Sequence, residues 1–364
     1  MLTETLDRLF GELCSHEVVQ AAEADGGAPE LWQAFAEAGF ARISVPEAAG
    51  GSGGTLLDAL EVLRLVGWHA APMPAADTSV LGGWLLAGAG LPVPSGPLAV
   101  PAAAEVEVAP AEAGTRSAEP AAVTLSGTAR GVPWARTADR IVMLVDAEPA
   151  RPLVVSVDPT EAASVAARRN LAGEPRDTLA FDAAPALAAP APPGIDHDAL
   201  ALRGALSRVA LMAGAMDRMS RLTVDYTNER VQFGRPVARF QAVQQHLVWA
   251  AQDAALTKMS AHCAGRAAQR AEDAGSRPGA VFEIAAAKLV ANQAAARATK
   301  ACHQAHGAMG MTQEYPLHHL SRRLWSWRME YGGEAEWAKR IGAVAVDRGA
   351  DGLYPLITAG TAAG

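Results

Sequence analysis

Long, alanine-rich helical segments fill the second half of the chain and limit the folds open to it. Residues 199–229, 241–271 and 280–308 carry apolar side chains at helical spacing, and residues 334–346 form a shorter segment of the same kind. Glycine and proline within residues 275–279 mark a break between the second and third segments. Helices of this length with short connections pack side by side, so the sequence predicts an antiparallel helical bundle.

Two further regions precede this bundle. Residues 1–90 have helical patterns, whereas residues 101–193 hold short β-branched runs between glycine, proline and aspartate. The proline-rich residues 183–193 are interpreted as a stiff linker that ends the β region. We therefore predict an α+β, mainly α fold. Its parts are an N-terminal helical domain (residues 1–100), a middle β domain (101–193), a C-terminal four-helix-bundle domain (194–350) and a tail (351–364).

Composition excludes several classes of protein. Half of the 364 residues are hydrophobic and 19% are charged, which is incompatible with disorder over most of the chain. The cysteines Cys14, Cys263 and Cys302 are too few for a disulfide framework, and the acidic start of the chain does not resemble a secretory signal. The uncharged residues 78–104 contain prolines that interrupt any membrane-spanning helix. These features predict a soluble, cytoplasmic protein without a membrane span.

Charge is unevenly divided between the two halves. Residues 1–193 have 11 basic and 24 acidic side chains, whereas residues 194–364 have 20 and 15, so the bundle is the basic part of an acidic protein. Two interpretations remain open: the bundle holds an anionic ligand, or the difference is chance variation between domains. The basic excess is small and does not alternate with aromatic residues, so we expect no nucleic-acid partner.

Two bundle segments carry motifs that helical periodicity does not explain. The first reads Tyr226-Thr227-Asn228-Glu229-Arg230-Val231-Gln232-Phe233-Gly234-Arg235-Pro236-Val237, followed by Phe240-Gln241. The second reads Gln304-Ala305-His306-Gly307-Ala308-Met309-Gly310, followed by Glu314-Tyr315-Pro316-Leu317 and Tyr331-Gly332-Gly333. Together they resemble the acyl-CoA dehydrogenase family, flavoenzymes that desaturate acyl-CoA thioesters. Val45-Pro46-Glu47 and Leu125-Ser126-Gly127 extend this resemblance toward the N-terminus.

The resemblance implies an FAD cofactor, an acyl-CoA substrate and an oligomer. In the family, an arginine at the end of a bundle helix meets the FAD pyrophosphate of the adjacent subunit, and Arg230 occupies that place. Further residues match the family's contacts to the ADP part and the adenosine of that FAD: Gln232, Phe233, Gln241, Gln304, His306 and Gly307. The expected partner is therefore a homologous acyl-CoA dehydrogenase subunit, in a hetero- or homo-oligomer.

Simpler interpretations of the same residues remain open. Arg230 could cap a helix C-terminus, and residues 304–307 could be an ordinary helix end. Cys302, His303 and His306 lie on consecutive turns but lack a fourth donor, so no metal site is predicted.

The family's catalytic base is missing from both positions that supply it. In the family a glutamate removes the substrate α-proton while the β-hydride passes to the flavin. That glutamate follows the tyrosine of a Y-E-G-T segment, or lies on the first long bundle helix. Here Gly332 follows Tyr331, and counting back from Arg230 puts Gly204 at the second position, with no glutamate within 20 residues of it. No catalytic residue is therefore predicted in this chain.

Two nearby features are interpreted as surface positions. Glu334 lies two residues beyond Gly332, and a shift of that size moves a carboxylate by several ångströms, so it is assigned to the surface or to a helix cap. The pair His318-His319 is expected on a helix surface or at a subunit contact.

The β region also lacks residues that wrap the flavin ring in the family. Aligning Leu125-Ser126-Gly127 with the family's segment puts Gly131, Val132 and Pro133 where the tryptophan and threonine of W-x-T-N are expected. Nothing in residues 100–119 reproduces the upstream T-E-P-x-x-G-S-D segment. The chain thus keeps the half of the cofactor site that faces a neighbour and lacks the half that would hold its own flavin ring.

This asymmetry leads to three hypotheses. In the first, the chain is the base-lacking partner subunit of a heteromeric acyl-CoA dehydrogenase and completes the FAD site of a second chain that holds the base. That arrangement resembles the two-gene enzymes of bacterial steroid side-chain breakdown, and the resemblance implies a role in fatty-acid or steroid side-chain catabolism. In the second, the chain is a flavin monooxygenase on the same fold, which needs no glutamate base. In the third, it is a non-enzymatic scaffold subunit.

Overall fold

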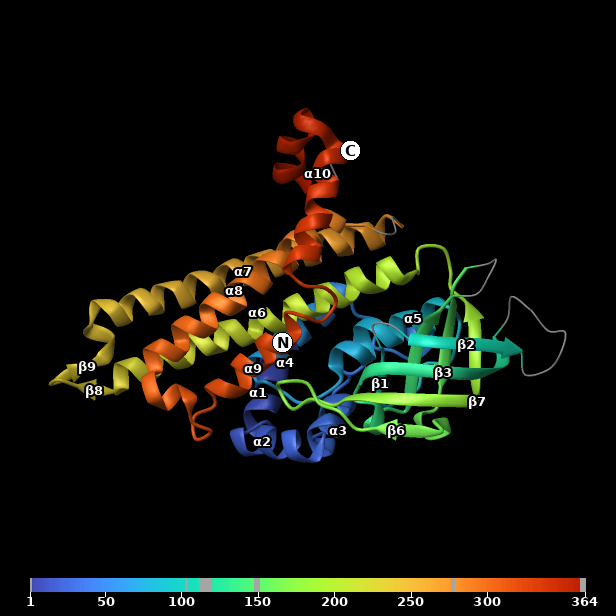
Figure 1. The fold of residues 1–364 in the computed structure, drawn as a ribbon, viewed down its shortest axis with the longest axis horizontal. Coiled ribbons are helices and arrows are strands. Elements are labelled where there is room, and N and C mark those ends of the chain that lie inside the picture. Colours follow the sequence, from blue (N-terminus) through green and yellow to red (C-terminus); the bar gives the residue numbers. More distant parts are fainter. Residues whose placement is uncertain (1, 102–103, 111–119, 147–150, 276–278, 361–364) are drawn as a thin grey trace.

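The computed structural model describes residues 2–101, 104–110, 120–146, 151–275 and 279–360. A helical N-terminal region, a β-sheet and a bundle of long helices follow one another along the chain, as predicted (Figure 1). Parts of three predictions lie outside the described residues. They concern the break at 275–279, the tail at 351–364 and the search for a flavin motif in residues 100–119.

The N-terminal region consists of helices that pack against the first bundle helix. Its α-helices are α1 (Leu2–Leu13), α2 (His16–Asp25), α3 (Pro29–Glu37), α4 (Leu56–Trp68) and α5 (Gly83–Gly88), and the π-helical segment η2 (Ala76–Gly82) precedes α5. Thr55 and Asp58 form a reciprocal capping box that fixes the start of α4. Gly67 allows α4 to lie directly on the bundle, since a Cβ there would be 2.0 Å from the carbonyl oxygen of Leu211.

The middle region is a mixed sheet with its own core. Its strands are β1 (Leu98–Ala99), β2 (Ala104–Pro110), β3 (Ala121–Pro133), β4 (Arg140–Val145), β5 (Leu153–Val157), β6 (Ser164–Ala166) and β7 (Arg176–Pro190). The strand order is β1-β4-β5-β7-β3-β2, with β6 on β7, and all pairs are antiparallel except β1 with β4. A separate cluster of buried side chains, including Leu125, Ile141 and Phe181, lies on this sheet.

The proposed linker at residues 183–193 is wrong for most of its length. These residues continue β7 as far as Pro190 and pair with both β3 and β5. Ala184, Ala186 and Ala188 are buried at alternate positions, so this segment has the period-two pattern of a strand in very small side chains. Alanine has a weak strand preference and proline usually ends a strand, which hid the pattern in the sequence.

The bundle begins with two helices of equal length. Its helices are α6 (His197–Glu229), α7 (Gln241–Asp273), α8 (Val281–His306), α9 (Leu317–Trp327) and α10 (Glu334–Ala359). The short strands β8 (Val231–Gln232) and β9 (Arg235–Pro236) form a hairpin between α6 and α7, at the end of the bundle remote from the sheet (Figure 1). Short 3-10 segments, η5 (Val237–Arg239) and η6 (Gly307–Met311), precede α7 and follow α8.

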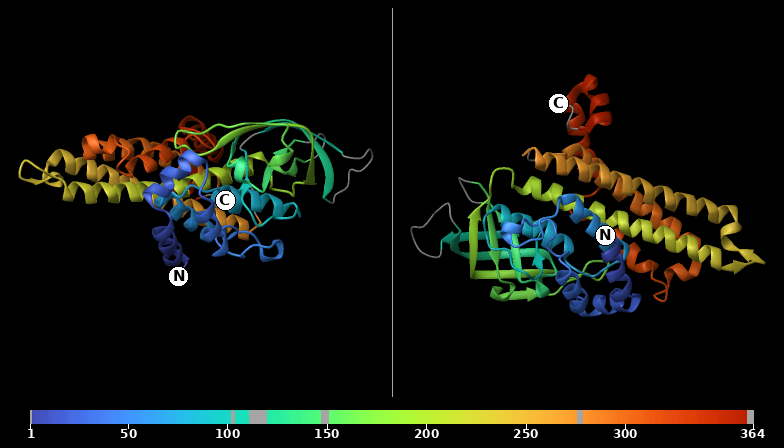
Figure 2. Two further views of the ribbon diagram at one scale, coloured as in Figure 1. Left: turned by 90° about the horizontal axis from the view of Figure 1, so that it is seen from below. Right: turned by 180° about the vertical axis from the view of Figure 1, so that it is seen from behind.

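Two features of the bundle helices qualify the sequence predictions. The last helix was expected to end near residue 346, but α10 continues into the predicted tail after a non-helical Gly349, and its end stands away from the body of the molecule (Figure 2). Within the described residues, one helix, α6, is long and apolar enough to cross a membrane, but 89% of its apolar window is buried inside the fold. It is a core helix of the bundle.

Candidate functional site

The residues that resemble the family's FAD contacts gather at one end of the bundle. Arg230 directly follows α6, and its backbone N–H donates to the carbonyl oxygen of Tyr226 over 2.9 Å. Gln232 and Phe233 belong to the β8–β9 hairpin, where Phe233 is 92% exposed, and Gln241 is the first residue of α7. The Arg230 side chain is exposed and has no ion pair within the described residues, so it is free to meet an anion.

The end of α8 forms the second part of this region. Gln304 and Gly307 line a surface hollow of about 530 Å³ together with Thr299 and Lys300. The Thr299 hydroxyl is buried and has no hydrogen-bond partner within the described part of the chain. A buried hydroxyl without a partner is costly, so it suits a polar ligand in the hollow. An exposed cation, an amide and a free hydroxyl together fit the polar, anionic ADP half of FAD.

The side chain of His306 is buried beneath this end of the bundle. Its side chain is only 4% exposed and stacks on Tyr226, with ring centroids 4.5 Å apart. Its Nδ1 lies 2.9 Å from the Cys302 carbonyl oxygen, and burial lowers the pKa of His306, so the ring is neutral. His306 therefore joins the end of α8 to the end of α6, so that Arg230 and Gln304 belong to one surface.

The described residues contain no group of three or more histidine, cysteine or acidic side chains that could hold a metal ion. Cys14, Cys263 and Cys302 are all free thiols. Burial raises the pKa of Cys302 to about 11, so this thiol is not an anionic ligand at neutral pH.

The two positions expected to lack a base lie against different neighbours in the structure. Gly204 on α6 faces the ring of Tyr331, and a Cβ added at Gly204 would be 2.3 Å from two carbons of that ring. The motif tyrosine, Tyr331, is therefore the residue that packs against α6 at Gly204. A Cβ on Gly332 would instead meet the indole nitrogen of Trp337 at 2.6 Å. Burial raises the pKa of Tyr331, so its hydroxyl stays protonated and is no substitute base.

Glu330, directly before Tyr331, is the carboxylate that sequence reasoning did not consider. It accepts hydrogen bonds from Arg176 Nη2 and from Arg208 Nε, each over 2.6 Å. Although burial acts in the opposite direction, these two guanidinium groups hold the pKa of Glu330 well below its usual range. A carboxylate fixed by two cations is a weak base, so Glu330 does not replace the missing glutamate.

Asp77, on the π-helical segment η2, is the other carboxylate of this cluster. Its side chain lies 3.7 Å from Arg208, it is 3% exposed, and its second oxygen has no hydrogen-bond partner within the described residues. Burial raises the pKa of Asp77 to about 6. A carboxylate with a raised pKa is a suitable base in principle, but Asp77 is covered and paired with a cation. No sequence motif identifies Asp77 as a candidate base. The sequence shows only that it is an isolated acidic residue in an apolar segment.

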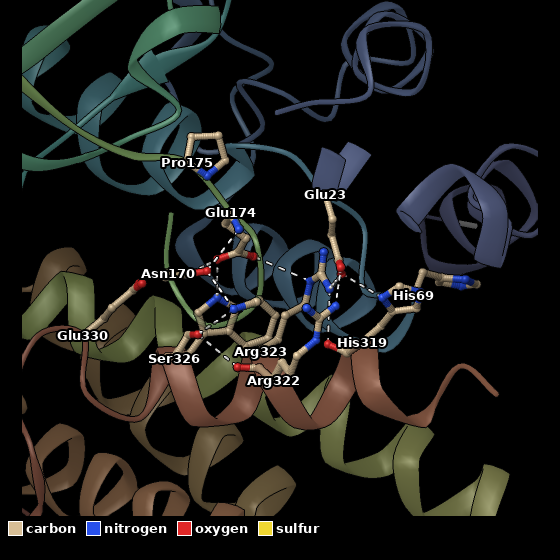
Figure 3. A network of polar contacts seen from close by, with 12 residues as sticks. Glu23, His69, Asn170, Glu174, Pro175, His319, Arg322, Arg323, Ser326 and Glu330 are labelled. Atoms are coloured by element: carbon tan, nitrogen blue, oxygen red, sulfur yellow. Dashed lines mark hydrogen bonds and ion pairs between the residues drawn. The ribbon is translucent and has the colours of Figure 1, made fainter. Parts of the chain in front are cut away.

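Glu334 and His319 were both predicted to lie at the surface, and the structure places them differently. Glu334 is in the first turn of α10, where an acidic side chain is favoured, and its carboxylate pairs with Arg328 and does not cap the helix. His319 is buried, so its assignment to a helix surface is wrong. It lies 2.7 Å from Glu23 Oε1, and Arg322 and Arg323 also contact Glu23 (Figure 3). This cluster joins α2 to α9.

The cluster at Glu23 continues toward Glu330. Arg323 Nε lies 3.6 Å from Glu174 Oε1, and Glu174 Oε2 accepts a hydrogen bond from Arg176 over 3.1 Å. Because Arg176 also contacts Glu330, acidic and basic side chains alternate from the N-terminal region through the start of β7 into the α9–α10 turn. Charged side chains thus connect the three parts of the chain.

The segment expected to lack the flavin-ring contacts is an irregular part of β3. The pairing of β3 with β7 shifts register between Ala129 and Val132, and Gly131 has a φ of 61°. Val132 is fully buried, and the next aromatic residue, Trp134, is 4% exposed. These side chains pack into the sheet, so neither of them offers an exposed surface to a flavin ring.

Comparisons with known proteins agree with this architecture. A family model described as "Acyl-CoA dehydrogenase, C-terminal domain" matches residues 201–346, and "Acyl-CoA dehydrogenase, N-terminal domain" matches residues 1–91. "Acyl-CoA dehydrogenase IpdE2" of Mycobacterium tuberculosis is 30% identical over 329 residues, which cover 89% of each protein. This chain belongs to the acyl-CoA dehydrogenase family.

Solved structures support the acyl-CoA dehydrogenase fold over nearly the whole chain. The ChsE4-ChsE5 complex from Mycobacterium tuberculosis contains a chain with a TM-score of 0.78 and 23% identity, covering 96% of this chain and 97% of that one. The "Tcur3481-Tcur3483 steroid ACAD G363A variant" has a TM-score of 0.77 and 23% identity, covering 95% and 97%. At these identities the likeness shows the fold alone.

Proposed function

We propose that this chain is the base-lacking partner subunit of a heteromeric acyl-CoA dehydrogenase. It would complete the FAD site of a second, homologous chain that carries the catalytic base, and the pair would desaturate an acyl-CoA thioester between its α and β carbons. The observation that carries the proposal is that both base positions are glycines, while Glu330, two residues before Gly332, is held by Arg176 and Arg208. Arg230 and the hollow beside Gln304, which would face the nucleotide, are exposed at the end of the bundle.

The chain's own residues would contribute binding and orientation. When bound, the flavin accepts the β-hydride of the substrate. The Arg230 guanidinium would pair with the pyrophosphate, for which a planar, permanently charged donor is well suited. Gln304, Lys300 and the free Thr299 hydroxyl would bind the adenosine end in the hollow after α8. His306 would act indirectly, because it holds the two helix ends together through Tyr226.

Two further observations favour a heteromer. The solved ChsE4-ChsE5 structure is named as a complex of two proteins, and the other neighbour is named as a steroid enzyme with two components. The outer face of α7 exposes apolar side chains, including Leu256 at 49% and Met259 at 62%, as a chain that binds a partner would. We extend the substrate class to acyl-CoA esters of fatty acids or steroid side chains, and the free cysteines fit a cytoplasmic location.

Co-expression with candidate partner chains tests the proposal. We expect the lone chain to be colourless and inactive, and the complex to be yellow and to oxidise acyl-CoA. In the complex, Arg230→Ala should weaken FAD binding by about tenfold or more, the usual scale for a lost charge-assisted hydrogen bond. Arg266→Ala is the matched control, because Arg266 is an exposed arginine far along α7 and should leave flavin content unchanged.

Each alternative function predicts a different experimental result. Tight flavin binding and acyl-CoA oxidation by the lone chain would show a self-sufficient dehydrogenase and contradict the proposal. Oxygen consumption that depends on a flavin reductase would identify a monooxygenase. Unchanged flavin content and activity in the Arg230→Ala complex would favour a non-enzymatic scaffold.

A further inference from the structure

A cavity of about 280 Å³ lies where the N-terminal helices meet the bundle. Residues of α1, α2, α4, α6 and α9 line it. On α6 the lining residue Arg218 lies 12 residues before Arg230 and 14 residues after Gly204, which is about 18 Å and 21 Å of helix. The cavity is therefore separate from the nucleotide end of the bundle and from both base positions.

Apolar surface and positive charge are combined in this cavity. Phe10, Val19 and Leu320 are buried and form part of its wall. None of the described residues that line it is acidic. The basic ones are His16, His69, Arg218 and His319. Such a lining favours a ligand with an apolar body and a negative charge.

Arg218 is a cation of this cavity that lacks a counter-charge. Its guanidinium carbon lies 5.5 Å from the centre of the Trp68 ring, a cation–π contact that orients the group without neutralising its charge. No carboxylate in the described part of the chain forms an ion pair with Arg218, and the residue is half-buried. A bound anion would supply the missing partner.

Three consecutive hydrogen bonds place a second positive charge at the cavity. His16 Nε2 lies 3.1 Å from the carbonyl oxygen of Gln313, and His16 Nδ1 lies 3.0 Å from His319 Nε2. His319 Nδ1 lies 2.7 Å from Glu23 Oε1. Because the carbonyl and the carboxylate at the two ends can only accept, the three bonds need three N–H protons, whereas two neutral imidazoles carry two. The pair of rings therefore holds one extra proton.

His16 is the ring that carries this proton. Although burial acts in the opposite direction, His319 and two arginines lower the pKa of Glu23 to about 2, so its carboxyl is ionised. Burial lowers the pKa of His319 to about 4, so this ring is neutral and donates to Glu23. His16, the more exposed ring, then donates from both nitrogens and is cationic.

We infer that this cavity is a binding site for a small organic acid. The carboxylate of the acid would pair with Arg218 and His16, and its apolar chain would lie on Phe10, Val19 and Leu320. An inorganic anion would leave this apolar surface in water, so the structure favours a carboxylic acid with an aliphatic chain. The inference does not depend on the proposed function, because the cavity shares no residue with the nucleotide end or the base positions.

Binding of hexanoate, 1-hexanol and inorganic phosphate to the full chain at pH 7, measured by calorimetry, tests the site. Hexanoate has both the charge and the chain, hexanol has only the chain, and phosphate has only the charge. We expect hexanoate to bind at least about tenfold more tightly than either of the others. Equal affinity for hexanoate and hexanol, or for hexanoate and phosphate, would overturn the inference.

Two substitutions locate the bound acid in the cavity. Arg218→Gln should weaken hexanoate binding about tenfold, the scale of a lost charge-assisted hydrogen bond. Arg221→Gln is the control, because Arg221 is exposed on the same helix and does not line the cavity. Gly11 lines the cavity, and within the described residues nothing lies within 4 Å of a Cβ added there.

Gly11→Leu should therefore fill the cavity without lowering the Tm, since leucine is also the better helix former. We expect it to weaken hexanoate binding by about tenfold or more. Unchanged affinity in Arg218→Gln or in Gly11→Leu would overturn the inference.

The proton on His16 makes the affinity depend on pH. The other titratable and charged groups around this ring and the cavity are Glu17 and Glu23 of α2, His318, His319, Arg322 and Arg323 of α9, Arg218 of α6, His69 beside the end of α4, and Asp7 of α1. Burial lowers the pKa of His69, His318 and His319 from the ordinary value of 6.5, so these rings stay neutral above pH 7.

The affinity for hexanoate should fall about threefold or more between pH 7 and pH 9 in the wild type and stay constant in His16→Gln, since only the wild type loses a cation. Nitrogen-15 spectra at pH 7 should show His16 protonated on both nitrogens and His319 on one. Equal wild-type affinities at the two pH values, or two singly protonated rings, would overturn the inference.

Discussion

Gly332 occupies a conformation in which a catalytic glutamate could not be restored by one substitution. Its φ is 104°, and an added Cβ would lie 2.6 Å from Trp337 Nε1 and 2.9 Å from Glu336 Oε2. We expect Gly332→Glu to cost at least about 2 kcal/mol of stability, because a side chain is strained there and has no room. Denaturant unfolding measures this cost.

The neighbouring glycine provides the control for that substitution. Gly333 has a negative φ, and its added Cβ would touch only the flexible end of Met329 at 3.5 Å, so Gly333→Ala should be close to neutral. An active lone Gly332→Glu chain would show that the loss of the base is a single reversible change, contrary to our prediction.

Asp77 is the residue that most directly tests whether this chain supplies a base of its own. Asp77 is covered and paired with Arg208, so we expect Asp77→Asn to leave the activity of the heteromer within about twofold of the wild type. Removal of a true general base would lower the activity about 100-fold or more. Asp217→Asn, which affects a surface ion pair with Lys258, is the control. A loss of 100-fold in the Asp77 variant would assign the base to this chain.

Asp77→Asn should also change the pH dependence of stability. The folded pKa of Asp77, about 6, is above its ordinary value of 3.8, so the folded chain binds the proton more tightly than the unfolded chain. The contribution of Asp77 to stability should therefore fall as pH rises from 4 through 6, so the stability of the wild type relative to Asp77→Asn should fall over that range. Urea unfolding between pH 4 and pH 7 measures the difference.

The positions of some individual residues can be predicted from the sequence, and the positions of others cannot. Gln241 at a helix start and Arg230 at a helix end follow from local patterns of capping and periodicity, and the structure confirms both. The burial of His319 and the direction of Tyr331 depend on partners far along the chain, Glu23 and Gly204. Spacing within one helix cannot show such partners.

Among the elements, α2 and α9 are joined by the cluster at Glu23. Burial raises the pKa of this carboxyl, but hydrogen bonds from His319 and Arg322 and the charge of Arg323 outweigh it and lower the pKa to about 2. Glu23→Gln should cost about 3 kcal/mol, because it leaves buried cations without their counter-charge. Glu17→Gln, on the exposed side of the same helix, should change stability by less than about 0.5 kcal/mol. Thermal unfolding of the two variants distinguishes them, and equal losses would contradict the assignment.

The same pair of helices should separate in acid. Burial lowers the pKa of His319 to about 4, and the pKa of Glu23 is about 2, so both folded values are below the ordinary values of 6.5 and 4.5. The stability from these groups is complete above pH 6.5 and is lost as pH falls through 4 and then 2. Limited proteolysis of α2 along an acid titration checks this, and Glu23→Gln should remove the lower part of the profile.

Elements with strong periodicity were predicted well, and elements made of small residues were not. The bundle helices α6 to α8 appear within a few residues of their predicted bounds, because their apolar faces repeat over many turns. The second half of β7 was interpreted as a linker, since its inward side chains are alanines between prolines. Its pairing with β3 and β5 supplies stability that local preference does not.

For the whole molecule, the proposed function assigns different roles to two parts of the bundle. Arg230 and the hollow beside Gln304 are open to a ligand. Elsewhere in the bundle, Gly204 and Gly332 stand at the two base positions, and Glu330 is held by Arg208. Under the proposed function, a homo-oligomer of this chain would have nucleotide contacts but no glutamate at either base position, so we expect the partner to be a different chain.

The proposed division of roles between the two chains predicts how much FAD the complex contains. If each chain of this type completes one FAD site in a partner and holds no flavin ring in its own cleft, a complex with equal numbers of the two chains contains one FAD for every two polypeptides. Flavin absorbance combined with the mass from light scattering measures the ratio. Removing the base glutamate of the partner should abolish acyl-CoA oxidation while the ratio stays the same, because the two functions lie in different chains. One FAD per polypeptide would mean that the irregular part of β3 around Gly131 does hold a flavin ring, and the division of roles between the chains would be wrong.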